Sequence, residues 1–164
     1  MKNKKLFIYT SIYMISMMVM IVIFINMFDI EALGTDMIIK KNSIEKATSI
    51  IINNLKNFIC YIVFFPIYVF MIAMDILQTS WAIAASFKIC GWTNTIDGLM
   101  PHAIIEIPIH ILYKYISSQL FCKLFIKKKD ILKVYSESIK NYYKYYIFCF
   151  WGIVLSGFVE GMIS

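Results

Sequence analysis

The sequence predicts an all-α fold: a polytopic bundle of about five transmembrane helices, forming one integral membrane domain over residues 1–164. Composition is the first reason, because 60% of the residues are apolar or aromatic and 16% are charged, against about 45–50% and about 25% in soluble domains. The second reason is the spacing of the charges, which leaves long apolar stretches between them. A soluble globular domain is therefore excluded.

The first element is the stretch 6–28, which holds no charged residue and follows Lys2, Lys4 and Lys5. A secretory signal has an apolar region of only about 7–15 residues, followed by a cleavage site with small residues. Because this stretch is longer and continues without such a site, we expect an uncleaved transmembrane helix.

A second helix is expected to begin near residue 43, because Asn42 is followed three residues later by a glutamate, the spacing of a capping box. Apolar residues then recur at helical spacing and lead into a longer apolar stretch. The predicted second span covers 52–74, and a soft turn at Asp75 to Thr79 is expected to end it.

The third element, 76–90, is short for a crossing. It would form about 22 Å of helix, whereas the hydrocarbon core is about 30 Å thick, and the following Gly91 favours a helix end. Two interpretations stay open: the segment crosses the bilayer, or it re-enters, which requires that protein or water shields its irregular backbone.

Two further spans are predicted at 100–122, where Pro101 and Pro108 interrupt the apolar run, and at 145–163. The segment between them, 123–144, carries seven lysines and two acids and has an apolar face at helical spacing. We expect it to be a basic connector at the cytoplasmic membrane surface.

Lysines also set the predicted orientation. The segments 1–5 and 123–144 are both rich in lysine, so the positive-inside rule places both in the cytoplasm. The number of crossings between them must then be even. This predicts a multi-pass cell-membrane protein with a cytoplasmic N-terminus and a C-terminus outside.

Polar side chains inside the predicted spans are the candidate functional residues, because a charge at the centre of a bilayer costs at least a few kcal/mol. This set comprises Asn53, Asn54, Asp75, His102, Glu106, His110 and Glu160. Three of them, His102, Glu106 and His110, follow one another at intervals of four residues. They therefore lie along one side of a helix.

Four roles fit this polar stripe. A metal site would need the kink at Pro108, because the two histidines are about 12 Å apart on a straight helix. A proton or ion relay would add Glu160. A buried hydrogen-bonded cluster that ties spans together, with Glu106 protonated or paired with His102, is the interpretation we favour. A contact site for a membrane partner or a hydrophobic peptide stays open. No metal and no cofactor is expected.

Two function classes are disfavoured by what the sequence lacks. All 16 basic residues are lysines, whereas the arginine fork is the usual reader of phosphates and guanine edges, so no nucleic-acid partner is expected. The sequence holds no zinc-protease helix motif, no nucleophile-elbow motif and no glycine-rich phosphate loop. We therefore expect a protein that is not an enzyme.

The segment from Leu99 to Pro108, with Pro101, His102 and Glu106, resembles the Leu-x-Pro-His-Gly-x-x-Glu signature of a known family. This is the stage II sporulation protein M family of bacterial integral membrane proteins. The resemblance implies a bacterial cell-membrane location and makes these three residues the family motif.

Two further landmarks carry the same resemblance. Asn53 and Asn54 resemble the Asn-Asn pair that opens the family's second span, and Glu160 with its two neighbours resembles the family's Ile-Glu-Ala ending. The match covers about 50–164 together with a first span in the expected place. Ala103 departs from the pattern, because the family usually has glycine there.

The resemblance implies one of two roles. Similar short members occur in gene clusters for circular bacteriocins, where they are linked to maturation, secretion or immunity. Sporulation members are membrane subunits of a complex that remodels the cell wall during engulfment. We expect the first role, with the bilayer and an ABC transporter or a peptide as partners. A small proton-coupled transporter or channel is a third hypothesis.

Overall fold

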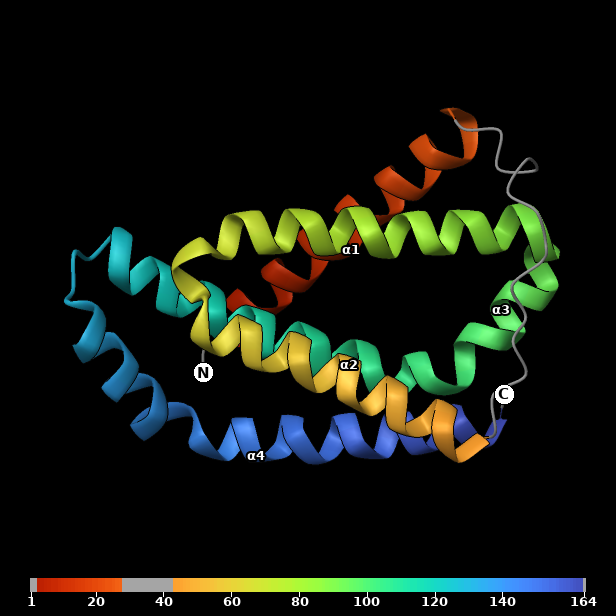
Figure 1. Ribbon diagram of the computed structural model, residues 1–164. Helices are drawn as coiled ribbons and strands as arrows, with labels where there is room; N and C mark the ends of the chain where they lie inside the picture. Colours follow the sequence, from red (N-terminus) through yellow and green to blue (C-terminus); the bar gives the residue numbers. More distant parts are fainter. Residues whose placement is uncertain (1–2, 28–42, 164) are drawn as a thin grey trace. The chain divides into compact units, whose positions relative to one another are not determined.

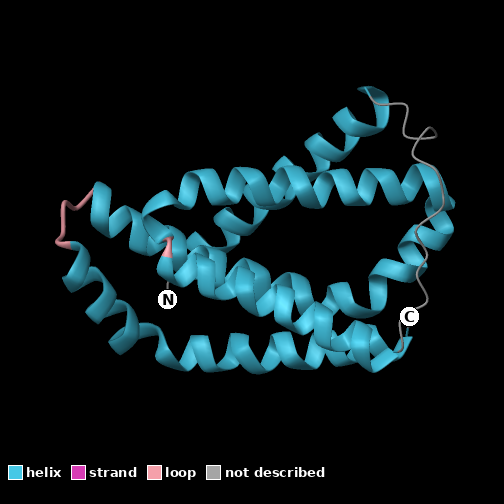
Figure 2. Ribbon diagram, in the orientation of Figure 1, coloured by secondary structure: helices cyan, strands magenta, loops and turns pink. Residues whose placement is uncertain are grey.

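The computed structural model describes residues 3–27 and 43–163, and it describes their side chains except at residues 3, 43, 46, 98–102 and 160–163. Nearly all of this described chain is helical, and it contains no strand (Figure 2). The predicted all-α fold is confirmed.

In chain order, the elements are α1 (Asn3–Met27), α2 (Ser43–Val63), the short 3-10 helix η2 (Phe65–Ile67), α3 (Tyr68–Phe125) and α4 (Ile131–Ile163) (Figure 1). The chain divides into two compact units, described separately below. The first unit takes in Met1–Lys41 and Ile72–Met100, and the second takes in Asn42–Met71 and Pro101–Ser164.

In the first unit, α1 packs against the first part of α3. The Ser80 hydroxyl donates a hydrogen bond to the backbone carbonyl of Met17 over 3.3 Å. The rings of Phe24 and Trp81 meet edge to face with their centroids 5.4 Å apart. One hydrogen bond and one aromatic contact thus join the two helices.

The soft turn expected at Asp75 to Thr79 is wrong, because α3 is helical through these residues. They include no glycine or proline, and their polar side chains alone do not end a helix. The interruption lies instead at Gly91, whose φ of 77° and ψ of 170° fall in a region that is essentially restricted to glycine. The helix end predicted at Gly91 is therefore confirmed.

The second predicted span is not one continuous helix, because α2 ends at Val63 and η2 follows. Pro66 has no backbone N–H, so the last turn of α2 loses a donor. The Ser117 hydroxyl donates to the carbonyl of Tyr61 over 2.8 Å, and the Tyr135 hydroxyl donates to the carbonyl of Val63. Side chains of α3 and α4 thus bond to carbonyls at the end of α2.

In the second unit, α2 and α4 pack along each other (Figure 1). Two glycines of α4 allow a close approach, one to α2 and the other to α3. A Cβ atom on Gly157 would lie 2.3 Å from Cγ1 of Ile51 in α2, and one on Gly152 would lie 2.3 Å from Cδ1 of Ile109 in α3. Small residues serve the same purpose at helix interfaces in membranes generally.

An apolar core closes one end of the second unit, where η2 meets α3 and α4. Its fully buried members are Phe65, Ile116, Leu120 and Val134. Beyond this core the chain turns, and α4 begins with a side-chain cap, because Oδ1 of Asp130 accepts the backbone N–H of Leu132 over 3.0 Å. The helix expected in the basic connector is confirmed, and it continues without interruption toward the C-terminus.

Within the described residues, two helical stretches are long and apolar enough to cross a membrane, Lys4–Met27 and Phe65–Asp97. The first coincides with the predicted span at 6–28. The crossings predicted at 52–74, 76–90, 100–122 and 145–163, and the sides on which the termini lie, stay predictions.

Candidate functional site

The candidate site is centred on Glu106 of α3, which lies between two side-chain partners. Nδ2 of Asn54, on α2, donates to Oε1 of Glu106 over 2.9 Å. Nε2 of His110, one turn further along α3, lies 3.3 Å from the same oxygen. We call Asn54, Glu106 and His110 the polar tie, because one carboxylate joins α2 to α3.

The polar tie is largely shielded from solvent, but its side chains are not fully buried. The side chain of Glu106 is 21% exposed and that of His110 is 19% exposed. In such surroundings an unpaired polar group costs about 1–3 kcal/mol, so the hydrogen bond from Asn54 helps to hold α2 and α3 in register. The tie can fix helix packing, and its partial exposure leaves the carboxylate within reach of another molecule.

The structure brings only part of the predicted polar set together. Asn54, Glu106 and His110 meet, whereas the neighbouring Asn53 is exposed. Asp75 belongs to the first unit and is half-buried there.

Other predicted residues lie where the side chains are not described. These are Pro101, His102 and Glu160, so the pairing of His102 with Glu106 and the relay through Glu160 stay predictions. For the metal interpretation, the described residues contain no group of three or more acidic, histidine or cysteine side chains placed to hold an ion.

Lys114 is a residue that the sequence reasoning missed. It is only 2% exposed, and its ammonium lies 5.8 Å from the ring centre of Tyr61, an arrangement that favours a cation–π interaction. Tyr113 beside it packs against Tyr61 and against His110, at ring-centre distances of 5.4 Å and 5.3 Å. Lys114 follows His110 by four residues, so continuing the four-residue interval of the polar stripe would have found it.

Ser156 adds a buried hydroxyl on the facing helix. It is fully buried on α4, between Gly152 and Gly157, the two positions where α4 approaches α3 and α2. Its hydroxyl makes no hydrogen bond to any residue that the structure describes. An unpaired hydroxyl in such a place is unusual, because buried polar side chains are generally bonded.

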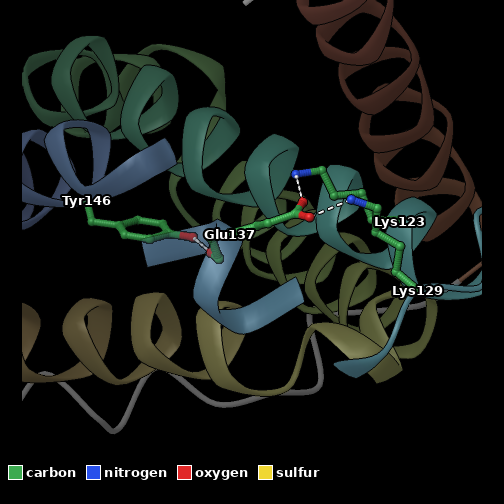
Figure 3. Close-up of polar contacts among 5 residues, drawn as sticks. Lys123, Lys129, Glu137 and Tyr146 are labelled. Carbon is green, nitrogen blue, oxygen red and sulfur yellow. Dashed lines mark hydrogen bonds and ion pairs between the residues drawn. The ribbon is translucent and has the colours of Figure 1, made fainter. Parts of the chain in front are cut away.

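A carboxylate with two lysine donors lies where α3 ends and α4 begins. Nζ of Lys123 lies 3.1 Å from Oε2 of Glu137, and Nζ of Lys129 bonds to its Oε1 (Figure 3). We call these three residues the lysine latch. Hydrogen bonds from Lys129 and Lys123 hold the pKa of the Glu137 carboxyl below its usual 4.5. Next to it, Ser138 and Tyr146 share a hydrogen bond between their hydroxyls.

An apolar, all-helical chain with two membrane-capable stretches indicates a helical membrane protein. A family model described as Stage II sporulation protein M matches residues 7–164. The chain therefore belongs to that family, and the resemblance drawn from the motif around Glu106 is confirmed. No curated protein and no solved structure matches the chain.

Proposed function

We propose that this protein is a non-enzymatic membrane subunit that assists the production, secretion or immunity of an antimicrobial peptide, a bacteriocin, together with an ABC transporter. Membership of the family supports the membrane-subunit part of the proposal. The arrangement of Glu106 is the structural observation that carries it.

Glu106 is held in the manner of a structural group. Its Oε1 is in contact with both Asn54 and His110, which come from two helices. A general base must instead reach the proton that it removes from a substrate. This arrangement of Glu106 favours a structural role, in which the carboxylate fixes α2 against α3. The fixed helices would then give a peptide or a transporter a constant surface to bind.

Deletion of the gene in its host tests the proposal. We expect lower bacteriocin yield, lower tolerance of the producer to its own peptide, or both. Unchanged yield together with unchanged tolerance would refute the proposed function.

Complementation of the deletion strain adds a matched pair of variants. Asn54→Ala removes the donor to Glu106, whereas Asn53→Ala changes an exposed neighbour of the same type. We expect the Asn53 variant to restore function and the Asn54 variant to restore it only in part. Equal restoration by both variants would show that the function does not depend on the polar tie.

A role in sporulation is the second candidate, favoured by the description of the family. Its test is the deletion strain's spore count, and normal sporulation would exclude this role. Proton-coupled transport is a third candidate, favoured by the partial exposure of Glu106 and His110. Purified protein in liposomes should then show a flux that Glu106→Gln abolishes; no flux, or an unaltered one, excludes it.

A further inference from the structure

The turn between α3 and α4 combines exposed apolar side chains with lysines. Ile126 is 73% exposed and Leu132 is 74% exposed, and these two residues flank the turn on either side. Between them lie Lys127, Lys128 and Lys129, all exposed. Large apolar side chains that border a basic turn are the composition of a segment that enters the headgroup layer of a membrane.

The positive charge of this turn is not neutralised within the described part of the chain. Lys123 and Lys129 are both used by Glu137, and the carboxylate of Asp130 accepts the backbone N–H of Leu132 as the cap of α4. The exposed Lys127, Lys128 and Lys133 form no ion pair with any described residue. Three cations therefore face outward without an acidic partner.

Two backbone amides of the turn are already bonded. The N–H of Lys127 donates to the carbonyl of Cys122 over 3.1 Å, and the N–H of Lys129 donates to the carbonyl of Lys123 over 3.2 Å. These amides are therefore not free to cradle an anion, and recognition falls to the side chains. Ammonium groups act as point charges, so the turn should select for negative charge rather than for one headgroup structure.

From this combination we propose that the α3–α4 turn is an anionic-phospholipid site, in which Lys127, Lys128 and Lys133 bind headgroup phosphates while Ile126 and Leu132 insert at the acyl boundary. The lysine latch already orders the end of α3 and the start of α4, so the turn loses little conformational freedom on binding. A lipid surface fits better than a soluble acidic protein because the apolar side chains border the lysines on both sides. The inference rests on membrane localisation and not on the proposed function.

The experiment uses the full chain in detergent, with native mass spectrometry to count retained lipids during titration with phosphatidylglycerol or with phosphatidylcholine of the same acyl chains. We expect phosphatidylglycerol to be retained preferentially. The triple variant Lys127→Gln, Lys128→Gln, Lys133→Gln should lower that preference about tenfold or more, because each lysine near an anionic surface contributes about 1 kcal/mol. Phosphatidylserine should behave like phosphatidylglycerol.

A control of equal charge change is Lys4→Gln, Lys5→Gln, Lys56→Gln, three exposed lysines outside residues 123–144 of the sequence. It should keep most of the preference. The double variant Ile126→Ser, Leu132→Ser should weaken retention of both lipids about tenfold, because it removes apolar area that would leave water. Unchanged melting temperatures without added lipid establish that each variant is folded.

Two results would overturn the proposal. Equal retention of both lipids by the unmodified protein would show that the turn does not select anionic lipid. An acidic soluble protein would then be the expected partner of its lysines. A control triple variant that loses as much preference as the turn variant would show that net charge alone attracts the lipid.

Discussion

Glu106 and Glu137 each lie between two polar side chains, and these neighbours differ in kind. Glu106 contacts an amide and an imidazole, Asn54 and His110, whereas Glu137 contacts two ammonium groups, those of Lys123 and Lys129. Their surroundings differ as well, since the Glu106 side chain is 21% exposed and that of Glu137 is 34% exposed.

Desolvation explains this difference. Placing two opposite charges in apolar surroundings costs hydration energy that their attraction does not always return, whereas an amide donor brings no charge with it. Near water the hydration cost is small, but solvent also weakens an ion pair. The polar tie should therefore matter most for stability, and the lysine latch should matter mainly for the local order of the turn.

The largest effect is expected from Glu106→Ala. This change leaves the Asn54 amide without its acceptor and removes the carboxylate beside His110. A loss of about 2 kcal/mol in unfolding free energy follows from the cost of an unpaired shielded group. Glu106→Gln keeps an acceptor oxygen and should cost clearly less. Denaturant unfolding in detergent measures both, and an alanine variant as stable as the glutamine variant would contradict this role of the tie.

The next effect concerns the close helix approach beside the tie. Gly157→Ala would place Cβ 2.3 Å from Cγ1 of Ile51 and 3.4 Å from its backbone nitrogen, so α2 or α4 must shift, at a cost of about 1 kcal/mol, the lower end for overpacking. Gly152→Ala is the control, because its nearest neighbour is the terminal Cδ1 of Ile109, which can move more easily. Melting temperatures should rank the Gly157 variant lowest, and the reverse ranking would be inconsistent with this packing.

A smaller effect is expected at the turn itself. Asp130→Ala removes the cap of α4 and should cost about 1 kcal/mol, whereas Asp130→Asn keeps an oxygen that can accept the N–H of Leu132. Amide hydrogen exchange at the start of α4 is the measurement. Faster exchange in the alanine variant alone is the expected result, and equal rates in all three proteins would show that the cap does not hold this helix end.

The smallest effect on global stability is expected from the lysine latch. Because the pKa of Glu137 is lowered in the folded protein, its contribution is present above the usual value of 4.5 and is lost as the pH falls through the lowered value. Glu137→Gln should remove that pH dependence, and added salt should weaken it in the unmodified protein. Hydrogen exchange at residues 126–133 between pH 3 and pH 6 tests this, and an equal response in both proteins would argue against the latch.

The fold could be predicted where local patterns dominate. The capping-box spacing that begins at Asn42 correctly placed the start of α2, and the glycine after the apolar run correctly placed the interruption at Gly91. Pro66 is a local signal for the end of α2 at Val63, but the apolar run across it predicts one span. The donors at this break, Ser117 and Tyr135, could not be found locally because they are distant in sequence.

The residues of the candidate site could be predicted from the sequence, but the contacts between their side chains could not. Asn54, Glu106 and His110 were all identified as polar residues in apolar helices, but helical spacing does not show which side chain of α2 faces Glu106. Lys114 was missed because lysines were counted only as markers of orientation, although it lies on the stripe. Glu137 was considered only for its charge, because no local pattern indicated that its carboxylate would bind two lysines from different segments.

The bonds at the end of α2 also bear on the order of synthesis. Ser117 lies 56 residues after the carbonyl to which it donates, and Tyr135 lies 72 residues after its own acceptor. During translation, α2 is therefore complete long before either hydroxyl exists, and until then the carbonyls of Tyr61 and Val63 need water or another donor. Because bare carbonyls are costly in hydrocarbon, the nascent chain should keep this end of α2 at a hydrated surface until α3 and α4 have been made.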